Sequence, residues 1–150
     1  MAVRIEPLTT APHPGWLALR RALWPECPDA EHERDMAAQV ADPDTFVQFI
    51  AWSGRDDPIG FAEAAIRRDA VNGATLSPVP FLEGLYVVPA ARRRGVARAL
   101  VAAVIGWARA AGYAELASDA RLGNEVSHAL HRALGFQETE RVVCFRRPLP

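Results

Sequence analysis

The stretch that decides the fold spans residues 82–98 and reads LEGLYVVPAARRRGVAR. Residues 81–88 are predicted to form a β-strand, which Pro89 ends. Three consecutive arginines lead to Gly95, and apolar residues at three- and four-residue steps predict a helix over residues 95–111. Loop amides at a helix N-terminus bind anions, and Gly95 lets an anion approach the backbone closely. The spacing matches neither a dinucleotide fingerprint nor a P-loop, so the residues alone predict a phosphate site, with a solvated arginine turn as the alternative.

The chain on either side of this stretch is predicted to contain further strands and helices. After it, we predict a strand over residues 115–119, a helix over residues 124–134 and a final strand over residues 136–146. The sequence contains no repeat and no linker, so residues 1–150 are predicted to be a single α+β domain. Before the stretch, the predicted elements are an edge strand at 3–8, a helix at 14–24, a helix at 30–41 capped by Asp29, and strands at 45–53 and 59–67.

The charged residues exclude several functions. The 150 residues include 17 basic and 18 acidic side chains, and every basic one is Arg, which excludes lysine-dependent mechanisms. A net charge of −1 argues against nucleic-acid binding, because phosphate affinity needs a basic surplus. Residues 1–75 carry 12 acids and 7 arginines, and residues 76–150 carry 6 acids and 10 arginines. This asymmetry fits either chance or two different partners.

Hydropathy and cysteine usage indicate the compartment. No segment approaches the roughly 20 apolar residues of a membrane span, and Arg4 and Pro7 stand where a signal peptide needs an apolar run. Cys27 and Cys144 lack the spacing of metal ligands, so we expect two free thiols and no metal. The sequence therefore predicts a reduced, cytoplasmic protein with no membrane partner.

Two motifs carry a family resemblance. Arg92-x-x-Gly95-x-Ala97, which follows a strand and opens a helix, resembles the acetyl-CoA pyrophosphate loop of the GCN5-related N-acetyltransferase superfamily. The later LHRALGF at residues 130–136, preceded by Asn124, resembles that superfamily's second cofactor element. The resemblance implies an α+β fold with a central mixed, mostly antiparallel sheet flanked by helices. It also implies acetyl-CoA as co-substrate and no metal.

Shorter motifs along nearly the whole chain narrow the resemblance to one branch. They are LWP at 23–25, GFAEA at 60–64, FLEG at 81–84, ASD at 117–119 and ETERV at 138–142. They resemble the aminoglycoside 6′-N-acetyltransferases. This implies an enzyme that acetylates the 6′-amine of a small polycationic aminosugar, confers antibiotic resistance and forms a homodimer.

The resemblance places the co-substrate on backbone groups of the opening stretch. Leu85, Tyr86 and Val87 would hold the thioester and pantetheine arm, with one strand amide facing the oxyanion. Asn124 would bind the pantetheine amides, and a helix N-cap is its equal alternative. The amides cradling the pyrophosphate would be those of Arg93, Arg94, Gly95, Val96, Ala97 and Arg98.

Carboxylates dominate the expected acceptor side. The acceptor arrives as an ammonium, so a base must take its proton. Glu83 and Asp119 are the catalytic candidates, and the resemblance implies that both also contact the aminosugar. A water relay and a purely structural role in loop hydrogen bonds are the alternatives. Glu83 shares strand parity with Leu85 and Val87, which predicts that it faces the acetyl group.

Four other residues belong to this reading of the acceptor side. Glu140 corresponds to a further aminosugar-contacting position. Trp24 could stack on a sugar ring, with a core position as its alternative. Glu63 could add to the acidic surface, although a solvent-facing strand position is favoured for it. His131 stands where many members have a tyrosine that protonates the CoA thiolate, so it is a candidate general acid, although a packed histidine bonded to a carbonyl is slightly favoured.

At two positions the sequence differs from the resembling enzymes, and both positions concern the binding of the acceptor. Cys27 and Ala70 stand where the resembling enzymes tend to have a histidine and a tyrosine. They favour, as a second hypothesis, an acetyltransferase acting on a polyamine, another small amine or a protein amine. A non-catalytic acyl-CoA-binding module is the third hypothesis, and the acids Glu83, Asp119 and Glu140 argue against it.

Overall fold

Four antiparallel strands form one sheet in the computed structural model, which describes residues 2–150. Each strand pairs with its neighbour in sequence, in the order β1-β2-β3-β4, so the predicted edge position of β1 is confirmed. The β2–β3 turn contains Gly54 at a φ of 64°, a conformation that favours glycine. The strands are β1 (Val3–Pro7), β2 (Phe46–Ser53), β3 (Asp57–Arg67) and β4 (Val79–Val87).

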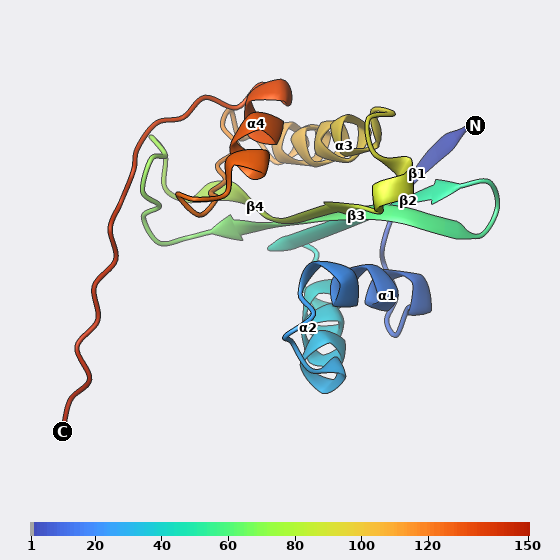
Figure 1. Cartoon of the computed structure of the whole chain (residues 1–150), viewed down its shortest axis with the longest axis horizontal. Helices are drawn as coiled ribbons and strands as arrows, with labels where there is room; N and C mark the ends of the chain where they lie inside the picture. Colours follow the sequence, from blue (N-terminus) through green and yellow to red (C-terminus); the bar gives the residue numbers. More distant parts are fainter. Residues whose placement is uncertain (1) are drawn as a thin grey trace.

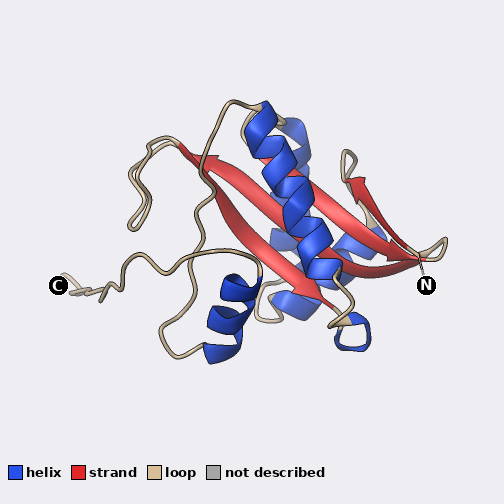
Figure 2. Cartoon of the chain, turned by 90° about the horizontal axis from the view of Figure 1, so that it is seen from above, coloured by secondary structure: helices blue, strands red, loops and turns tan. Residues whose placement is uncertain are grey.

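Helices cover both faces of the sheet (Figure 1). α1 and α2 pack on one face, and α3 lies across the other, as Figure 2 shows from above. α4 lies on the same side as α3, near β4. The helical elements are α1 (Pro14–Leu23), α2 (Asp29–Ala41), the 3-10 turn η1 (Pro89–Ala91), α3 (Val96–Ala110) and α4 (Glu125–Ala133).

Two apolar cores hold these layers together. On one face, Leu100 and Val104 of α3 pack in a cluster with Leu82 of β4. On the other face, Trp16 of α1 packs in a cluster with Phe61 of β3, and both are fully buried. Burying one such side chain contributes about 1.5–3 kcal/mol. The two cores therefore hold the sheet in place from its opposite faces.

The predicted cap of α2 was wrong. Pro28 occupies the N-cap position and no side chain caps the helix. Asp29 is instead the first helical residue, and its carboxylate accepts hydrogen bonds from the Arg21 guanidinium. A charged partner on α1 competes successfully with the backbone amides for this carboxylate.

The two strands predicted after α3 were also wrong. Residues 115–119 form only one parallel bridge, between Ala117 and Phe81. Residues 136–150 first pass along the cleft and then extend away from the body of the protein (Figures 1 and 2), and they pair with no strand among residues 2–150. A suitable side-chain pattern does not make a strand without a neighbouring backbone to pair with.

A bulge in β4 changes the predicted direction of Glu83. Glu63 of β3 pairs with Gly84 and the next residue pairs with Leu82, so Glu83 is an extra residue in its strand. Leu82 and Leu85 therefore pack in the same α3-side cluster although they are three residues apart. The prediction that Glu83 shares the face of Leu85 was wrong, because the bulge interrupts the alternation.

The expectation for Glu63 was wrong as well. Its residue is only 4% exposed, on the face of β3 that α1 and α2 cover. Both of its carboxylate oxygens accept hydrogen bonds from Arg20 of α1. A carboxylate can be buried at this depth because a guanidinium pairs with it.

Candidate active site

The arginine loop, residues 92–95, joins η1 to α3. Its Arg92 amide donates to the Pro89 carbonyl at 3.3 Å, and the amides of residues 93–95 have no hydrogen-bond partner among residues 2–150. Arg93 and Gly95 both adopt left-handed backbone conformations, with φ of 62° and 79°. Gly95 is the N-cap of α3, and no side chain caps that helix end. The first helical hydrogen bond is donated by Ala99 to the Gly95 carbonyl at 3.0 Å, so the amides before it have no intrahelical partner. Nothing lies within 4 Å of a Cβ built on Gly95, so an anion can reach these amides.

Two arginines fix this loop to its surroundings. Arg92 Nε donates to the Val87 carbonyl at 2.8 Å, and its guanidinium carbon lies 5.7 Å from the centre of the Tyr86 ring. Arg98 Nη2 donates to the Ala133 carbonyl at 2.7 Å. The loop is thereby held against the end of β4, and the start of α3 is joined to the end of α4.

A cleft of about 1030 Å³ opens beside the start of β4. Its walls are the β3–β4 loop, residues 114–122, α4 and the segment that follows α4. Three of the predicted acceptor-side residues line it, namely Asp119, His131 and Glu140. The cleft and the arginine loop therefore lie at opposite ends of β4, with residues 83–87 between them.

The two candidate catalytic carboxylates differ in their partners. Glu83 is bound through both oxygens by Arg67 Nε and Nη2, at 2.8 and 2.7 Å, and Arg67 stacks 3.5 Å above the centre of the Phe81 ring. These bonds to Glu83, with the charge of Asp119 as a smaller cause, raise the pKa of Arg67 above its ordinary value. Asp119 is exposed and forms no ion pair among residues 2–150. Its oxygens remain free for a ligand.

Trp24 lies directly against the strand that carries Glu83. A Cβ built on Gly84 would be 2.6 Å from Trp24 Cη2, so the ring occupies the space that any larger residue would fill. The ring also meets Phe61 edge-on, with 5.8 Å between ring centres. Trp24 is half-buried, so it belongs to the α1-side core and borders the neighbourhood of Glu83.

His131 is oriented from both ring nitrogens. Nδ1 lies 2.7 Å from the Ser127 carbonyl, which only accepts hydrogen bonds, so Nδ1 carries the proton. Nε2 lies 2.7 Å from the Ser118 hydroxyl, which donates to a bare Nε2 and accepts from a protonated one. The ring packs edge-on against Phe136, with 5.2 Å between centres.

Asn124 caps α4 in the structure. Its Oδ1 accepts a hydrogen bond from the Ser127 amide at 3.1 Å. The cap engages the side-chain oxygen only, so the side-chain NH₂ group remains available as a donor.

Comparison with known proteins assigns the chain to a family. The model of the acetyltransferase (GNAT) family matches residues 16–136. An aminoglycoside N(6′)-acetyltransferase type 1 of Stenotrophomonas maltophilia is 48% identical over 148 residues, which are 99% of this chain and 95% of the relative. The chain belongs to the GNAT family, in its aminoglycoside 6′-N-acetyltransferase branch.

Solved GNAT structures agree with this assignment. AAC(6′)-Iy in complex with the bisubstrate analogue CoA-S-monomethyl-acetylneamine superposes with a TM-score of 0.93 at 42% identity, covering 99% of this chain and 100% of that one. Apo AAC(6′)-IG from Acinetobacter haemolyticus gives 0.90 at 44% identity, covering 98% and 99%. The GNAT fold expected from the sequence is therefore confirmed.

This GNAT chain also contains site residues that sequence reasoning missed. Arg67 binds Glu83, and Ser118 orients His131. Glu115 accepts hydrogen bonds from the Thr75 amide and hydroxyl and from the Leu76 amide, at 3.0, 2.8 and 3.1 Å, so it ties the β3–β4 loop to the cleft. These bonds lower the pKa of Glu115 below its ordinary value. No sequence signal indicates these contacts, because each one depends on how distant segments align.

Of the two departures noted in the sequence, one lines the cleft and the other does not. Ala70 lines the cleft as an exposed residue of the β3–β4 loop. Cys27 follows α1 as a free thiol, and desolvation together with the nearby Glu31 and Asp35 raises its pKa. Cys144 is also a free thiol and lines the cleft.

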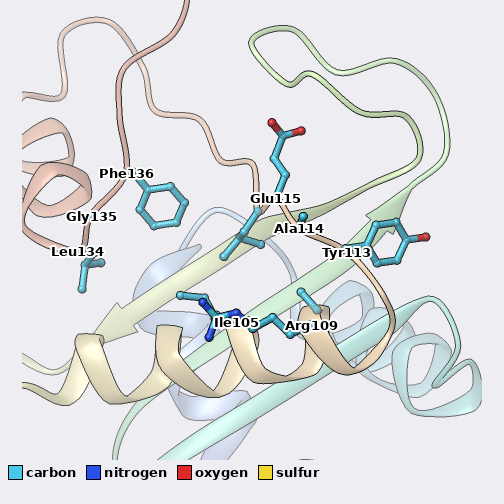
Figure 3. Close-up of a pocket in the computed structure, with 10 residues that line it drawn as sticks. Ile105, Arg109, Tyr113, Ala114, Glu115, Leu134, Gly135 and Phe136 are labelled. Carbon is cyan, nitrogen blue, oxygen red and sulfur yellow. The ribbon is translucent and has the colours of Figure 1, made fainter.

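A second, smaller pocket holds none of the predicted site residues. It measures about 220 Å³ and lies between the end of α3 and the chain around Leu134 and Phe136 (Figure 3). Glu115 borders it but points away from α3, toward the β3–β4 loop (Figure 3). Within residues 2–150 no helix is long and apolar enough to cross a membrane, and no three potential ligands gather as a metal site would require.

Proposed function

We propose that this protein transfers the acetyl group of acetyl-CoA to the 6′-amine of an aminoglycoside and thereby confers resistance to the antibiotic. The observation that carries this proposal is the arrangement along β4, with an anion-binding loop at one end and, at the other, a cleft whose lining of five acids and four arginines includes the carboxylate of Asp119, unpaired among residues 2–150. The full-length likeness to aminoglycoside N(6′)-acetyltransferases supports it. Residues 1–150 act as a single N-acetyltransferase domain.

Acetyl-CoA is the co-substrate, and this chain offers suitable groups for each of its parts. The free amides at residues 93–98 bind the pyrophosphate, aided by the positive end of the α3 dipole. The backbone of residues 85–87 holds the pantetheine arm and supplies an oxyanion donor. The side-chain NH₂ group of Asn124 donates to a pantetheine amide while its oxygen caps α4.

The acceptor is a small polycation, and the acids near the cleft attract it. Asp119 and Glu140 line the cleft. Glu83 is bound by Arg67, which also lines the cleft, and this places a third carboxylate next to it. Trp24 offers an aromatic surface to the sugar ring next to Glu83. The combination of carboxylates and an aromatic ring fits an aminosugar.

Asp119 takes the proton from the acceptor amine. We assign this role to Asp119 because Arg67 already engages both oxygens of Glu83. The amine lone pair then attacks the thioester carbonyl and the C–N bond forms. The nitrogen releases its second proton to water, and the C–S bond breaks with its electron pair going to sulfur. His131 is the candidate donor of the proton that the thiolate takes up, and it must first become protonated at Nε2.

A homodimer in the cytoplasm completes the proposal. The segment after α4 exposes several large apolar side chains, and Phe145 is 93% exposed. A second copy of the chain is the occupant we propose for this surface, because so much exposed apolar area favours association.

Sedimentation at increasing concentration should show a dimer that dissociates when Phe145 is replaced by Asp. A wild-type monomer at all concentrations would contradict the dimer.

An acceptor panel tests the activity. The purified protein is given acetyl-CoA and one amine at a time while free thiol is followed. We expect rapid thiol release with kanamycin or tobramycin and none with an aminoglycoside that carries a 6′-hydroxyl. Faster turnover of a polyamine would instead support the second acceptor class, which the Cys27 and Ala70 departures favour. Acetyl-CoA binding without release with any amine would indicate a non-catalytic module.

A further inference from the structure

A buried polar cluster lies under α1, on the face of β3 opposite α3. It joins α1, α2 and β3, and five of its six members are at most 9% exposed. The proposed reaction uses none of them directly. The cluster consists of Trp16, Arg20, His32, Asp35, Gln39 and Glu63.

Arg20 is the centre of this cluster and is only 4% exposed. Its Nη1 donates to Glu63, its Nη2 to Asp35 at 3.2 Å, and its Nε to His32 Nδ1 at 3.1 Å. Three separate partners therefore fix both the position and the plane of the guanidinium. Glu63 also accepts from Trp16 Nε1 at 2.9 Å, so its carboxylate is held firmly as well.

This fixed guanidinium lies over the ring of Trp24. The Arg20 guanidinium carbon lies 4.8 Å from the centre of the Trp24 ring, a distance typical of a cation–π contact. On another side, the ring touches the backbone of β4 at Gly84. Phe61 packs against it edge-on. The position of Trp24 is thus set by a buried ionic group, a strand backbone and one aromatic neighbour.

We infer that Arg20 is a positioning residue for the acceptor, acting through Trp24. The buried cluster locks the guanidinium, and the guanidinium holds the indole against Gly84, beside Glu83. This inference rests on the proposed function, in which Trp24 contacts the aminosugar. Arg20 determines the acceptor KM without touching the acceptor.

The charges of the cluster suit a cationic ligand. An unpaired arginine next to a polycation site would repel the substrate. Here the single positive charge of Arg20 is matched by Glu63 and Asp35, and His32 is neutral because its Nδ1 accepts from Arg20. The cluster can therefore support an aromatic platform without adding positive charge to the site.

The test replaces the charged pair together, because Arg20→Met alone would leave a buried carboxylate unpaired. In the Arg20→Met/Glu63→Gln protein we expect the aminoglycoside KM to rise about tenfold. The acetyl-CoA KM and kcat should change less than about twofold. Arg21→Met, an exposed arginine on the same helix, is the matched control and should change none of these.

The same double substitution made in a Trp24→Ala protein separates a positioning role of Arg20 from a merely structural one. If Arg20 acts through Trp24, the double substitution should not raise the acceptor KM further in a Trp24→Ala protein. Gly84→Ala, which places a methyl group against the indole, should raise the acceptor KM in the same way as the double substitution. An equal rise with and without Trp24 would overturn the inference, and so would an unchanged KM in the folded double variant.

One measurement of the Trp24 position does not depend on the acetyl-transfer reaction. The indole N–H signal of Trp24 in an NMR spectrum without substrate should shift and broaden in the double variant and in Gly84→Ala. An unmoved signal would overturn the positioning role even if aminoglycosides are substrates. An inactive wild type whose Trp24 signal still responds would overturn the proposed function and leave the Arg20–Trp24 coupling standing.

Discussion

The face carrying α1 and α2 and the region after α3 are built differently. On the face that carries α1 and α2, charged groups such as Arg20 and Glu63 are buried in an ionic cluster. This cluster packs against strands that are paired along their length. In the second, α4 has no buried residue, and residues 136–150 have no strand partner within the described chain. Each region contributes proposed acceptor residues, Trp24 from the first and Asp119 and Glu140 from the second.

This difference teaches how the acceptor side is stabilised. Buried contacts hold Trp24 in place before any ligand arrives. The cleft around Asp119 depends on a few exposed hydrogen bonds, such as those that Glu115 accepts. Regions with few buried contacts open more easily than cores. We therefore expect substitutions in the first region to affect folding and those in the second to affect turnover and local order.

The largest effect is expected for Asp119→Asn in the second region. The amide cannot take the amine proton, so turnover should fall about 10²–10⁴-fold while the acetyl-CoA KM changes little. Steady-state kinetics across pH with both substrates varied will measure this. Asp69→Asn, in the β3–β4 loop of the same cleft, is the control and should remain active. Unchanged turnover at every pH would remove Asp119 from the mechanism.

Glu63→Gln should give the largest loss of stability in the first region. It leaves Arg20 buried without its main counter-charge, so the free energy of unfolding should fall by about 3–5 kcal/mol. Chemical denaturation will measure the change. Asp29→Asn breaks the exposed pair with Arg21 and should alter stability little. Equal losses for the two variants would show that burial of the pair does not matter.

Asn124 allows its two roles to be separated. Asn124→Ala removes the cap of α4 and should cost about 1 kcal/mol locally, whereas Asn124→Ser keeps a capping oxygen. Hydrogen exchange of the α4 amides should therefore speed up only in the alanine variant. If the side-chain NH₂ group binds pantetheine, both variants should raise the acetyl-CoA KM. A serine variant with normal KM would leave Asn124 as a cap only.

The smallest effect concerns pH and Glu115. Its pKa is lowered in the folded protein, chiefly by the bond from Thr75, from an ordinary value of 4.5. Its contribution to stability is therefore present above the ordinary pKa and is lost as the pH falls through the lowered one. Between about pH 6 and pH 3, wild type should lose slightly more stability than Glu115→Gln. Parallel curves would show that this anchor contributes nothing.

Much of the fold was predictable because its signals are local. The helix of α3 follows from apolar residues at three- and four-residue steps, and α4 was predicted with Asn124 at its start, where a cap was one of two equal alternatives for that residue. The strands that failed, residues 115–119 and 136–146, have acceptable strand sequences but no backbone ladder. A strand depends on its neighbour, which the strand's own residues do not specify.

For this protein the sequence alone determined the element order, the arginine loop with its free amides, and the family, since all three depend on residues close together in the chain. Only the tertiary structure decided the partners of the acids. Glu63 is buried against an arginine 43 residues away, and a one-residue bulge turns Glu83 toward Arg67. Strand register and helix docking set these pairings, and a single inserted residue reverses which face a side chain occupies.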